Sequence, residues 1–358
     1  MKTLYKNALI DGKLTDILCE NGKIACLGQF DGDGVELDGR KVYAGLIDVH
    51  THGNMGHDTM DGKYLPEISR YLAENGVTSF LPTTMTMDFE HIKSIVNIDI
   101  PKTDGATILG FHLEGPYIAE SRRGAQNINY IRKPDIKEFE TLKNIRMVTI
   151  APETENALEF VEKCKCVVSL GHTDADYDTS IKAMENGANC LTHTFNAMTP
   201  MHHLNPGPIG AAIEKNAYVQ VICDGVHIHK SVINMLYRTF GKDRMVLISD
   251  SMNGAGLSEG IYEFGGQKVR ICDGVARTLD GVVAGSTSNL LKCVKKAMEF
   301  GIPEKDAFYM ASHTPAMLIG ETAKGEIKEG FDADFVVVDD EYNAVMTVIS
   351  GNAVYTKG

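Results

Sequence analysis

Two histidines one residue apart stand at the end of an apolar segment, Gly45-Leu46-Ile47-Asp48-Val49-His50-Thr51-His52-Gly53. Side chains alternate across a β-strand, so His50 and His52 would point to the same face, about 6–7 Å apart along the strand. One metal ion, or a close pair of ions, can accept both imidazoles. Such a pair alone is equally compatible with histidines that only stabilise a core or a surface. Its interpretation therefore depends on what the other segments carry.

Later apolar segments also end at residues whose side chains can bind metals or transfer protons. These residues are Glu114, His172, His193, His227 and Asp250. Taken singly, a histidine at a strand end is more often structural, Glu114 before Gly-Pro can simply end a strand, and Asp250 can cap the next segment. Chance does not readily place such residues at six strand ends of one face. The set therefore predicts a metal-dependent hydrolytic site.

The residue types indicate which ion would be bound and what it would do. Imidazole nitrogen and carboxylate oxygen are typical ligands of Zn²⁺ or Fe²⁺. Glu114, His172 and His193 would hold one ion with a position left open for water, and His50 and His52 would hold a second, with Glu114 bridging. A bound divalent ion lowers the pKa of its water toward about 7. Asp250 would then take the proton and pass it to a leaving group.

These residues need a framework that brings strand ends together, and the chain predicts one. Apolar, β-branched runs alternate with helical patterns such as 67–75, 136–143 and 179–186. Near-continuous apolar character suits strands covered on both faces. Eight candidate strands match a (β/α)₈ TIM-like barrel, in which chemistry lies at the C-terminal strand ends. The candidates are 46–50, 78–81, 107–113, 147–150, 167–170, 190–194, 218–223 and 246–249, followed by an inserted hairpin over 261–278.

Both ends of the chain predict β-structure outside this barrel. Asn21-Gly22 joins two strand-like runs, 15–20 and 23–27, and this dipeptide is a strong hairpin signal. The runs 333–338 and 344–349 also have the character of strands. Because chain termini often lie close together, we expect a small β domain from residues 1–44 and 327–358, and a metal-binding barrel domain over 45–326.

Composition limits the function classes. The chain has 358 residues, 43% of them hydrophobic and 23% charged, which is ordinary for a globular enzyme, and its net charge is −13. That charge argues against nucleic acid as a partner. No apolar run reaches the ~18 residues of a membrane helix. The eight cysteines show no paired framework, and the first residues lack the apolar region of a signal peptide, which together predict a cytoplasmic location.

The segments at the strand ends resemble those of the amidohydrolase superfamily, and within it the N-acetylglucosamine-6-phosphate deacetylases. The resemblance spans nearly the whole chain in the order of the family. His-Leu-Glu-Gly-Pro and Asn-Ala-Met are specific to the deacetylases, whereas Asp-x-His-x-His is shared by the superfamily. The matching segments are 45–53, 112–116, 171–173, 192–198, 224–227, 249–252, 284–286 and 330–336.

This resemblance implies hydrolysis of the N-acetyl group of an amino sugar 6-phosphate, with N-acetylglucosamine 6-phosphate as the expected substrate, in amino sugar metabolism. It implies one or two divalent ions, a homodimer, Asp250 as the acid/base and His227 as a group that stabilises the oxyanion or meets the phosphate. Glu114 would take the place of the superfamily's bridging lysine. Substrate contacts are implied for Ala125, Asn196, Ala197, His227, Ala284, Gly285 and Ser286.

One loop departs from the family. Its members usually carry an arginine after Asn-Ala-Met that reaches the phosphate of a neighbouring subunit's substrate, and Leu204 stands there in this chain. Losing a bidentate donor weakens phosphate recognition. The missing phosphate contact would be replaced by His202, His203 or the pair Arg122-Arg123. Alternatively, these are ordinary polar loop residues. The galactosamine epimer and an unphosphorylated N-acetyl sugar therefore remain alternative substrates.

Two other functions are also compatible with the sequence. One is a different amidohydrolase reaction, such as ring-amide opening or deamination, against which the deacetylase motifs speak. The other is a barrel that binds without catalysis. Proteins of that kind usually lose ligands, and none is missing from this sequence.

Overall fold

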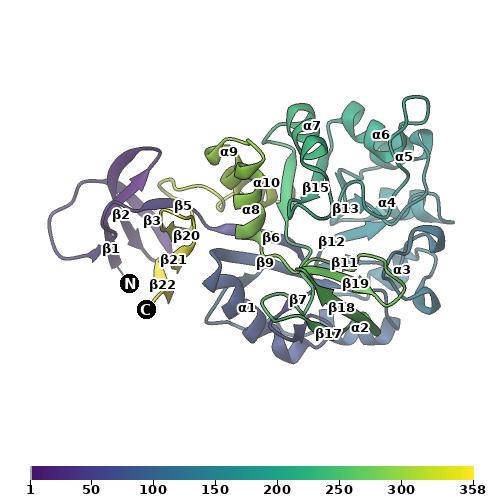
Figure 1. Cartoon of the computed structure of the whole chain (residues 1–358), viewed down its shortest axis with the longest axis horizontal. Coiled ribbons are helices and arrows are strands. Elements are labelled where there is room, and N and C mark those ends of the chain that lie inside the picture. The colour runs from purple at the N-terminus through teal and green to yellow at the C-terminus, as the bar shows by residue number, and fades with distance from the viewer. Residues whose placement is uncertain (1) are drawn as a thin grey trace.

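A computed structural model describes residues 2–358 and contains a barrel with a smaller sheet beside it (Figure 1). The barrel sheet follows the order β6, β9, β11, β12, β13, β14, β15, β16, and β10 pairs with β9. Every neighbouring pair is parallel. The strands are β6 Leu46–Thr51, β9 Val77–Thr84, β10 Thr107–Ile108, β11 Phe111–Glu114, β12 Ile145–Ile150, β13 Val167–Leu170, β14 Cys190–Leu191, β15 Tyr218–Ile222 and β16 Met245–Ile248.

The first and last strands meet beyond the end of β16. The amide of Asp250 donates to the carbonyl of His50 at 2.9 Å, and the amide of His52 donates to the carbonyl of Ser251 at 2.8 Å. The predicted TIM-like barrel is therefore confirmed. Its closure also places Asp250 beside the His50–His52 pair.

Helices cover the outside of the barrel, as expected for parallel strands that are apolar on both faces. β6 and β9 are buried along their whole length. The helices are α1 Leu65–Glu74, α2 Phe89–Val96, α3 Ile136–Phe139, α4 Ala157–Lys163, α5 Tyr177–Glu185, α6 Gly207–Lys215, α7 Lys230–Phe240, α8 Leu290–Glu299, α9 Glu304–Tyr309 and α10 His313–Leu318. No helix of residues 2–358 has the length and apolar character needed to cross a membrane.

Several predicted bounds were wrong, and the backbone explains the largest difference. The expected strand 107–113 is split into β10 and β11 at Gly110, whose φ is +128°. A Cβ there would lie 2.6 Å from the carbonyl oxygen of Asn144, so only glycine fits. The strands expected over 190–194 and 218–223 end earlier, at Leu191 and Ile222, and the helix expected over 136–143 stops at Phe139.

The two ends of the chain share one sheet, as predicted (Figure 1). β20 pairs antiparallel with β5, and β21 and β22 extend that edge. The sheet has its own core, in which the rings of Tyr5 and Phe335 meet edge to face at 5.1 Å. The division into domains at residues 44/45 and 326/327 stays a prediction. The strands are β1 Lys2–Ile10, β2 Lys13–Glu20, β3 Lys23–Gly28, β4 Val35–Glu36, β5 Lys41–Ala44, β20 Phe335–Val338, β21 Ala344–Ile349 and β22 Asn352–Thr356.

Two small sheets complete the fold. The hairpin expected over 261–278 is a three-stranded antiparallel sheet of β17 Gly260–Phe264, β18 Gln267–Cys272 and β19 Val275–Thr278. Gly265 and Gly266 form its first turn with φ of +57° and +75°, the left-handed conformations of a type I′ turn. β7 Gly53–Asn54 and β8 His57–Asp58 form a short ribbon after β6. Phe264 at the end of β17 contacts the ring of His52 at 5.4 Å between centroids.

Candidate metal centre

The ends of five barrel strands bring the predicted ligands and the predicted acid/base together. His50 is in β6, His52 follows it, Glu114 ends β11, and His172 and His193 lie just beyond β13 and β14. Asp250 lies two residues beyond β16. All six side chains are buried, from 0% exposed for His50 to 7% for Asp250. This is the C-terminal mouth, where barrel enzymes carry their chemistry.

Three of these residues have unusual backbone conformations. His172, His193 and Asp250 have φ of +48°, +27° and +46°. The left-handed region is costly for residues with a Cβ, by about 1–3 kcal/mol each, and such strain is concentrated at functional sites. The surrounding barrel therefore holds these side chains against a local preference.

Glu114, His172 and His193 form one group of donor atoms. The Oε1 atom of Glu114 lies 3.0 Å from Nε2 of His193 and 3.3 Å from Nε2 of His172. The two Nε2 atoms are 3.0 Å apart. These distances follow from the closed barrel and not from any local sequence pattern, but the three residues are the set predicted for the first ion.

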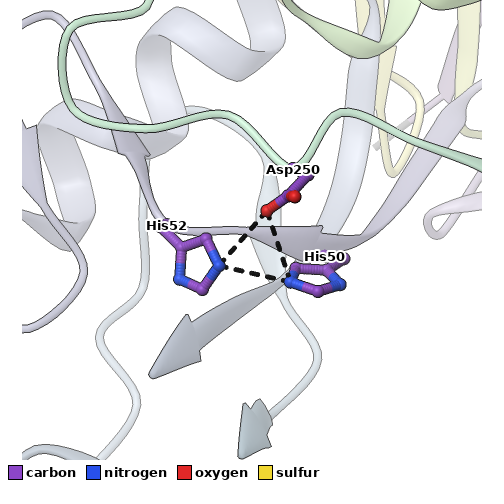
Figure 2. Close-up of side chains that lie close together, drawn as sticks. All are labelled: His50, His52 and Asp250. Atoms are coloured by element: carbon purple, nitrogen blue, oxygen red, sulfur yellow. Dashed lines mark hydrogen bonds and ion pairs between the residues drawn. The ribbon is translucent and has the colours of Figure 1, made fainter. Parts of the chain in front are cut away.

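His50, His52 and Asp250 form a second group (Figure 2). The two Nε2 atoms are 3.2 Å apart, and Oδ1 of Asp250 lies 3.4 Å from that of His50 and 3.3 Å from that of His52. Glu114 joins both groups, because its Oε1 lies 3.3 Å from Nε2 of His50 and its Oε2 lies 3.2 Å from Nε2 of His52.

This donor set fits divalent metal ions. Ligand atoms about 2.1 Å from one ion lie about 3.0–3.4 Å from each other in octahedral or tetrahedral coordination. The separations within each group match that spacing. Nitrogen and oxygen donors only, with no thiolate, suit Zn²⁺ or Fe²⁺. Both groups therefore have the composition and spacing of a divalent-metal site.

Hydrogen bonds orient three of the imidazoles so that Nε2 faces the centre. Nδ1 of His50 lies 3.0 Å from Oε1 of Gln220, Nδ1 of His172 lies 2.9 Å from the carbonyl of Arg122, and Nδ1 of His52 lies 3.2 Å from the carbonyl of Thr83. Each oxygen can only accept, so each Nδ1 carries a proton, and Nε2 is the nitrogen left to bind a metal ion. Such partners fix the tautomer of a metal ligand.

Two glutamines outside the predicted set of site residues belong to this arrangement. Gln220 accepts from His50, as described above. Gln126 donates from Nε2 to Oε2 of Glu114 at 2.8 Å, and its Oε1 accepts from the amide of Thr86 at 2.7 Å. Gln220 carried a signal, because it is the one polar residue within the buried strand β15. Gln126 lies in a loop, where nothing in the pattern marks it.

The buried carboxylates of the centre favour a positive charge beside them. Burial lowers the pKa of His52, but hydrogen bonds to Asp250 and Glu114 outweigh it and raise the pKa to about 10. Burial would raise the pKa of Asp250, yet the charges of His50 and His52 lower it to about 2. The buried carboxylates therefore remain ionised and attract a cation, either a proton on imidazole or a metal ion.

A cavity of about 360 Å³ opens above the donor groups. Six of the substrate contacts implied by the resemblance line it: Ala125, Asn196, Ala197, His227, Ala284 and Gly285. Ser286 does not line it, because its buried hydroxyl donates to the carbonyl of Ser249. His203 is exposed, and its ring contacts that of His202 at 4.2 Å between centroids with the planes tilted by 45°. It is not among the cavity-lining residues of the described chain.

His227 is held by a carboxylate next to it. Its Nδ1 lies 2.7 Å from Oδ2 of Asp224. Burial would lower the pKa of His227, but the hydrogen bond and charge of Asp224 outweigh burial and raise it. The pair with Asp224 therefore favours the protonated imidazole, whose second N–H suits an oxyanion or a phosphate at the cavity wall.

Arg122 is the one lysine or arginine among the cavity-lining residues of the described chain. Its guanidinium pairs with Asp174 at 2.8 Å and is about one-third exposed. Arg123, its neighbour, is exposed and does not line the cavity. The structure thus separates the two arginines that the sequence offered as replacements for the missing loop arginine.

Comparisons with known proteins agree with this geometry. The model of the amidohydrolase family matches residues 42–354. N-acetylglucosamine-6-phosphate deacetylase of Bacillus subtilis is 36% identical over 96% of the chain and 91% of the relative. N-acetylgalactosamine-6-phosphate deacetylase of Escherichia coli O157:H7 is 33% identical over 92% of each protein.

A solved structure leads to the same family. The crystal structure of N-acetylglucosamine-6-phosphate deacetylase from Thermotoga maritima superimposes with a TM-score of 0.90 at 31% identity, covering 99% of this chain and 100% of that one. With the barrel, the donor set and a family match over most of the sequence, the chain belongs to the amidohydrolase family of hydrolytic enzymes.

Proposed function

We propose that this enzyme hydrolyses the N-acetyl group of an amino sugar 6-phosphate, N-acetylglucosamine 6-phosphate foremost, and releases acetate and the amino sugar phosphate. The observation that carries the proposal is the group Glu114, His172 and His193 beside Asp250 at the floor of a single cavity. Support for the substrate comes from the deacetylases that match more than nine-tenths of the chain.

Glu114, His172 and His193 would hold the first divalent ion, and His50 and His52 the second, with Zn²⁺ or Fe²⁺ as the expected metal. Such an ion supplies a water of lowered pKa and positive charge near the scissile carbonyl. Asp250 is ionised and buried at the same floor, so it accepts a proton from the attacking water. It then returns that proton to the nitrogen that leaves as the free amine.

The cavity wall would position the sugar. The pair with Asp224 favours the protonated form of His227, which would donate to the oxyanion or to the phosphate. Arg122 supplies the permanent positive charge that a phosphate requires in a molecule of net charge −13. Asn196 is held by a bond from its Nδ2 to the carbonyl of His193 at 3.1 Å, which leaves its amide oxygen free for the sugar.

The galactosamine epimer is the second candidate substrate. One relative, 33% identical over 92% of the chain, is named for that activity. A panel of N-acetylglucosamine and N-acetylgalactosamine, each with and without the 6-phosphate, separates the candidates by acetate release. We expect the highest kcat/KM with N-acetylglucosamine 6-phosphate. Ammonia without acetate would instead indicate a deaminating or ring-opening amidohydrolase.

We further propose that the enzyme is a cytoplasmic homodimer. Met201 and Leu204 are 42% and 74% exposed on the loop that precedes α6, an apolar surface that a second copy would cover. All eight cysteines are free thiols, which is typical of a reducing compartment. Sedimentation of the wild type and of a Leu204→Glu variant tests the dimer, which predicts twice the chain mass for the wild type and a single-chain mass for the variant.

A further inference from the structure

Two cysteine thiols contact each other on the side of the barrel away from the metal centre. Cys164 follows the last residue of α4, and Cys166 precedes β13. Their Sγ atoms are 3.5 Å apart, and both residues are half-buried. β13 begins next to this pair, whereas His172 lies beyond its other end. The thiols therefore lie at the opposite end of β13 from the candidate active site.

A second cavity adjoins the thiol pair. It has a volume of about 470 Å³, and Cys166 is part of its wall. Lys163, Lys165 and Arg146 also line it, against a single carboxylate, that of Glu140. Apolar side chains form the rest of the wall, among them Phe139, Leu142 and Ile319. The cavity is thus cationic although the whole molecule carries a net charge of −13.

Among the three cationic side chains of this wall, Lys165 is available to bind a ligand. Arg146 binds Glu321 and the carbonyl of Ile319, and Lys163 pairs with Glu159 one helical turn away. Lys165 has no ion-pair partner within residues 2–358. It shares the cavity wall with Cys166, whose Sγ lies 3.5 Å from that of Cys164, so an anion that binds Lys165 lies beside one thiol of the pair and next to the other.

The two thiols are close enough for one to displace a group bound to the other, because their Sγ atoms are 3.5 Å apart. The thiolate is the nucleophile in thiol–disulfide exchange. The hydrogen bond from Cys166 lowers the pKa of Cys164, which favours Cys164 as the attacking sulfur and Cys166 as the thiol that resolves the mixed disulfide.

We propose that Cys164 and Cys166 are a redox-active thiol pair that exchanges with a small anionic disulfide, of the class of oxidised glutathione, bound in the cationic cavity beside them. The Cys164 thiolate attacks one sulfur of the ligand, forms a mixed disulfide and expels one thiolate, which takes up a proton. Cys166 then loses its proton, attacks Cys164 and expels the second thiolate. Two protein thiols are oxidised to one disulfide, and one ligand disulfide is reduced to two thiols.

The test uses the full-length protein and oxidised glutathione. Cleavage after Glu162 and Glu185 yields a peptide of residues 163–185 that contains Cys164 and Cys166 and no other cysteine. We expect this peptide to become lighter by two hydrogen atoms, about tenfold faster than the exposed thiols Cys26 and Cys272 acquire glutathione. The Cys166→Ser variant should stop at a glutathione adduct on Cys164, and Cys164→Ser should react no faster than Cys26.

A second comparison tests the cavity itself. The wild type should react faster with oxidised glutathione than with the neutral bis(2-hydroxyethyl) disulfide, and Lys165→Gln should remove that preference. A matched control, Lys268→Gln on the exposed side of β18, should keep it. The proposal is overturned if residues 163–185 remain reduced, if each cysteine carries its own adduct, or if the pair reacts at the rate of Cys26.

Discussion

At the scale of single residues, binding of the phosphate of the proposed substrate depends on Arg122. No other lysine or arginine lines the cavity, within the part of the chain described. We expect Arg122→Gln to raise KM for the 6-phosphorylated substrate by about 10–100-fold, since a hydrogen bond to a charged group contributes about 1.5–3 kcal/mol. Turnover of the unphosphorylated sugar should not change, and neither should the phosphorylated reaction of Arg123→Gln. Equal KM effects on both sugars would exclude this role.

Asp224 sets the protonation state of His227. Its hydrogen bond and charge raise the pKa of His227 against the effect of burial. A step that needs protonated His227 proceeds below that pKa and fails as the pH rises through it. In Asp224→Asn the pKa should fall, so the basic limb of the pH profile of kcat/KM should move to lower pH. A basic limb at the wild-type position would show that His227 does not act as a proton donor.

The choice of Asn matters for this test. Oδ1 of Asp224 also accepts from the amides of Val226 and His227, at 2.8 and 3.0 Å, and so fixes the turn. Asparagine retains one oxygen for those bonds. Asp224→Ala would lose the turn together with the charge, so the Asn and Ala variants separate the electrostatic contribution from the structural one.

The site residues that could be predicted from the sequence carry local signals, whereas those that could not be predicted depend on contacts between distant strands. His50 and His52 were visible because strand alternation and an adjacent glycine are local features. The partners that orient them come from distant strands, for example Gln220 on β15, 170 residues from His50. No local pattern specifies such a contact, and the left-handed backbone of His172 and His193 is likewise imposed by the closed barrel.

At the scale of elements, close packing between β13 and β14 positions His172 and His193, two of the proposed metal ligands. Gly171 precedes His172, and a Cβ at Gly171 would lie 2.6 Å from Cβ of Thr192, the residue before His193. Thr192 is fixed from below by its hydroxyl contacts with Thr149 at 2.8 Å and Ser169 at 2.6 Å. A side chain at Gly171 would therefore displace both histidines.

We expect Gly171→Ala to lower metal affinity and to destabilise the fold by about 1–3 kcal/mol, the usual cost of overpacking. Metal content by elemental analysis and unfolding in denaturant measure the two effects. Gly62→Ala is the matched control, because its Cβ would meet only a side-chain methyl group at 3.8 Å. A Gly171→Ala protein with full metal content and unchanged stability would contradict the packing argument.

Strand bounds can be predicted where a strand is a short apolar run with a clear end. The bounds of β13 and β21 were predicted to the residue, because each is a short apolar run with polar or glycine residues at its end. The strand predicted over 190–194 was too long, since the two β-branched threonines of Thr192-His193-Thr194 favour a strand but the chain turns into the site after Leu191. An element that bends to deliver a functional side chain can therefore end before its β-branched pattern does.

At the scale of the whole molecule, the barrel is joined to a sheet built from both chain ends. Lys324 lies between α10 and β20 and binds Asp334 at 2.6 Å and Asp332 at 3.0 Å. Asp334 is 5% exposed, accepts from the amide of Ser350 at 2.7 Å, and its carbonyl accepts from the amide of Gly45 at the entry to β6. The Lys324–Asp334 pair thus fixes the residue whose carbonyl binds Gly45 at the junction between the two sheets.

Removing Lys324 leaves a buried carboxylate without its cation, which usually costs about 3–5 kcal/mol. Lys324→Met should lower the free energy of unfolding by that amount, as measured by denaturation. Lys357→Met, which removes an exposed pair at 3.7 Å from Asp339, should change it by less than about 1 kcal/mol. If the two variants are equally stable, the contact between the sheets does not depend on this pair.

In the proposed reaction, water is added to the acetamide carbonyl of the substrate with Asp250 as the proton carrier. A single turnover of N-acetylglucosamine 6-phosphate by the metal-loaded enzyme in oxygen-18 water tests this step directly. We expect one oxygen-18 atom in the acetate and none in the sugar phosphate apart from its exchangeable anomeric oxygen. Asp250→Asn, with its metal retained, should slow this turnover by about 10²–10⁴-fold. Label at any other position of the sugar phosphate, absence of acetate, or a wild-type rate in the variant would overturn the proposed reaction.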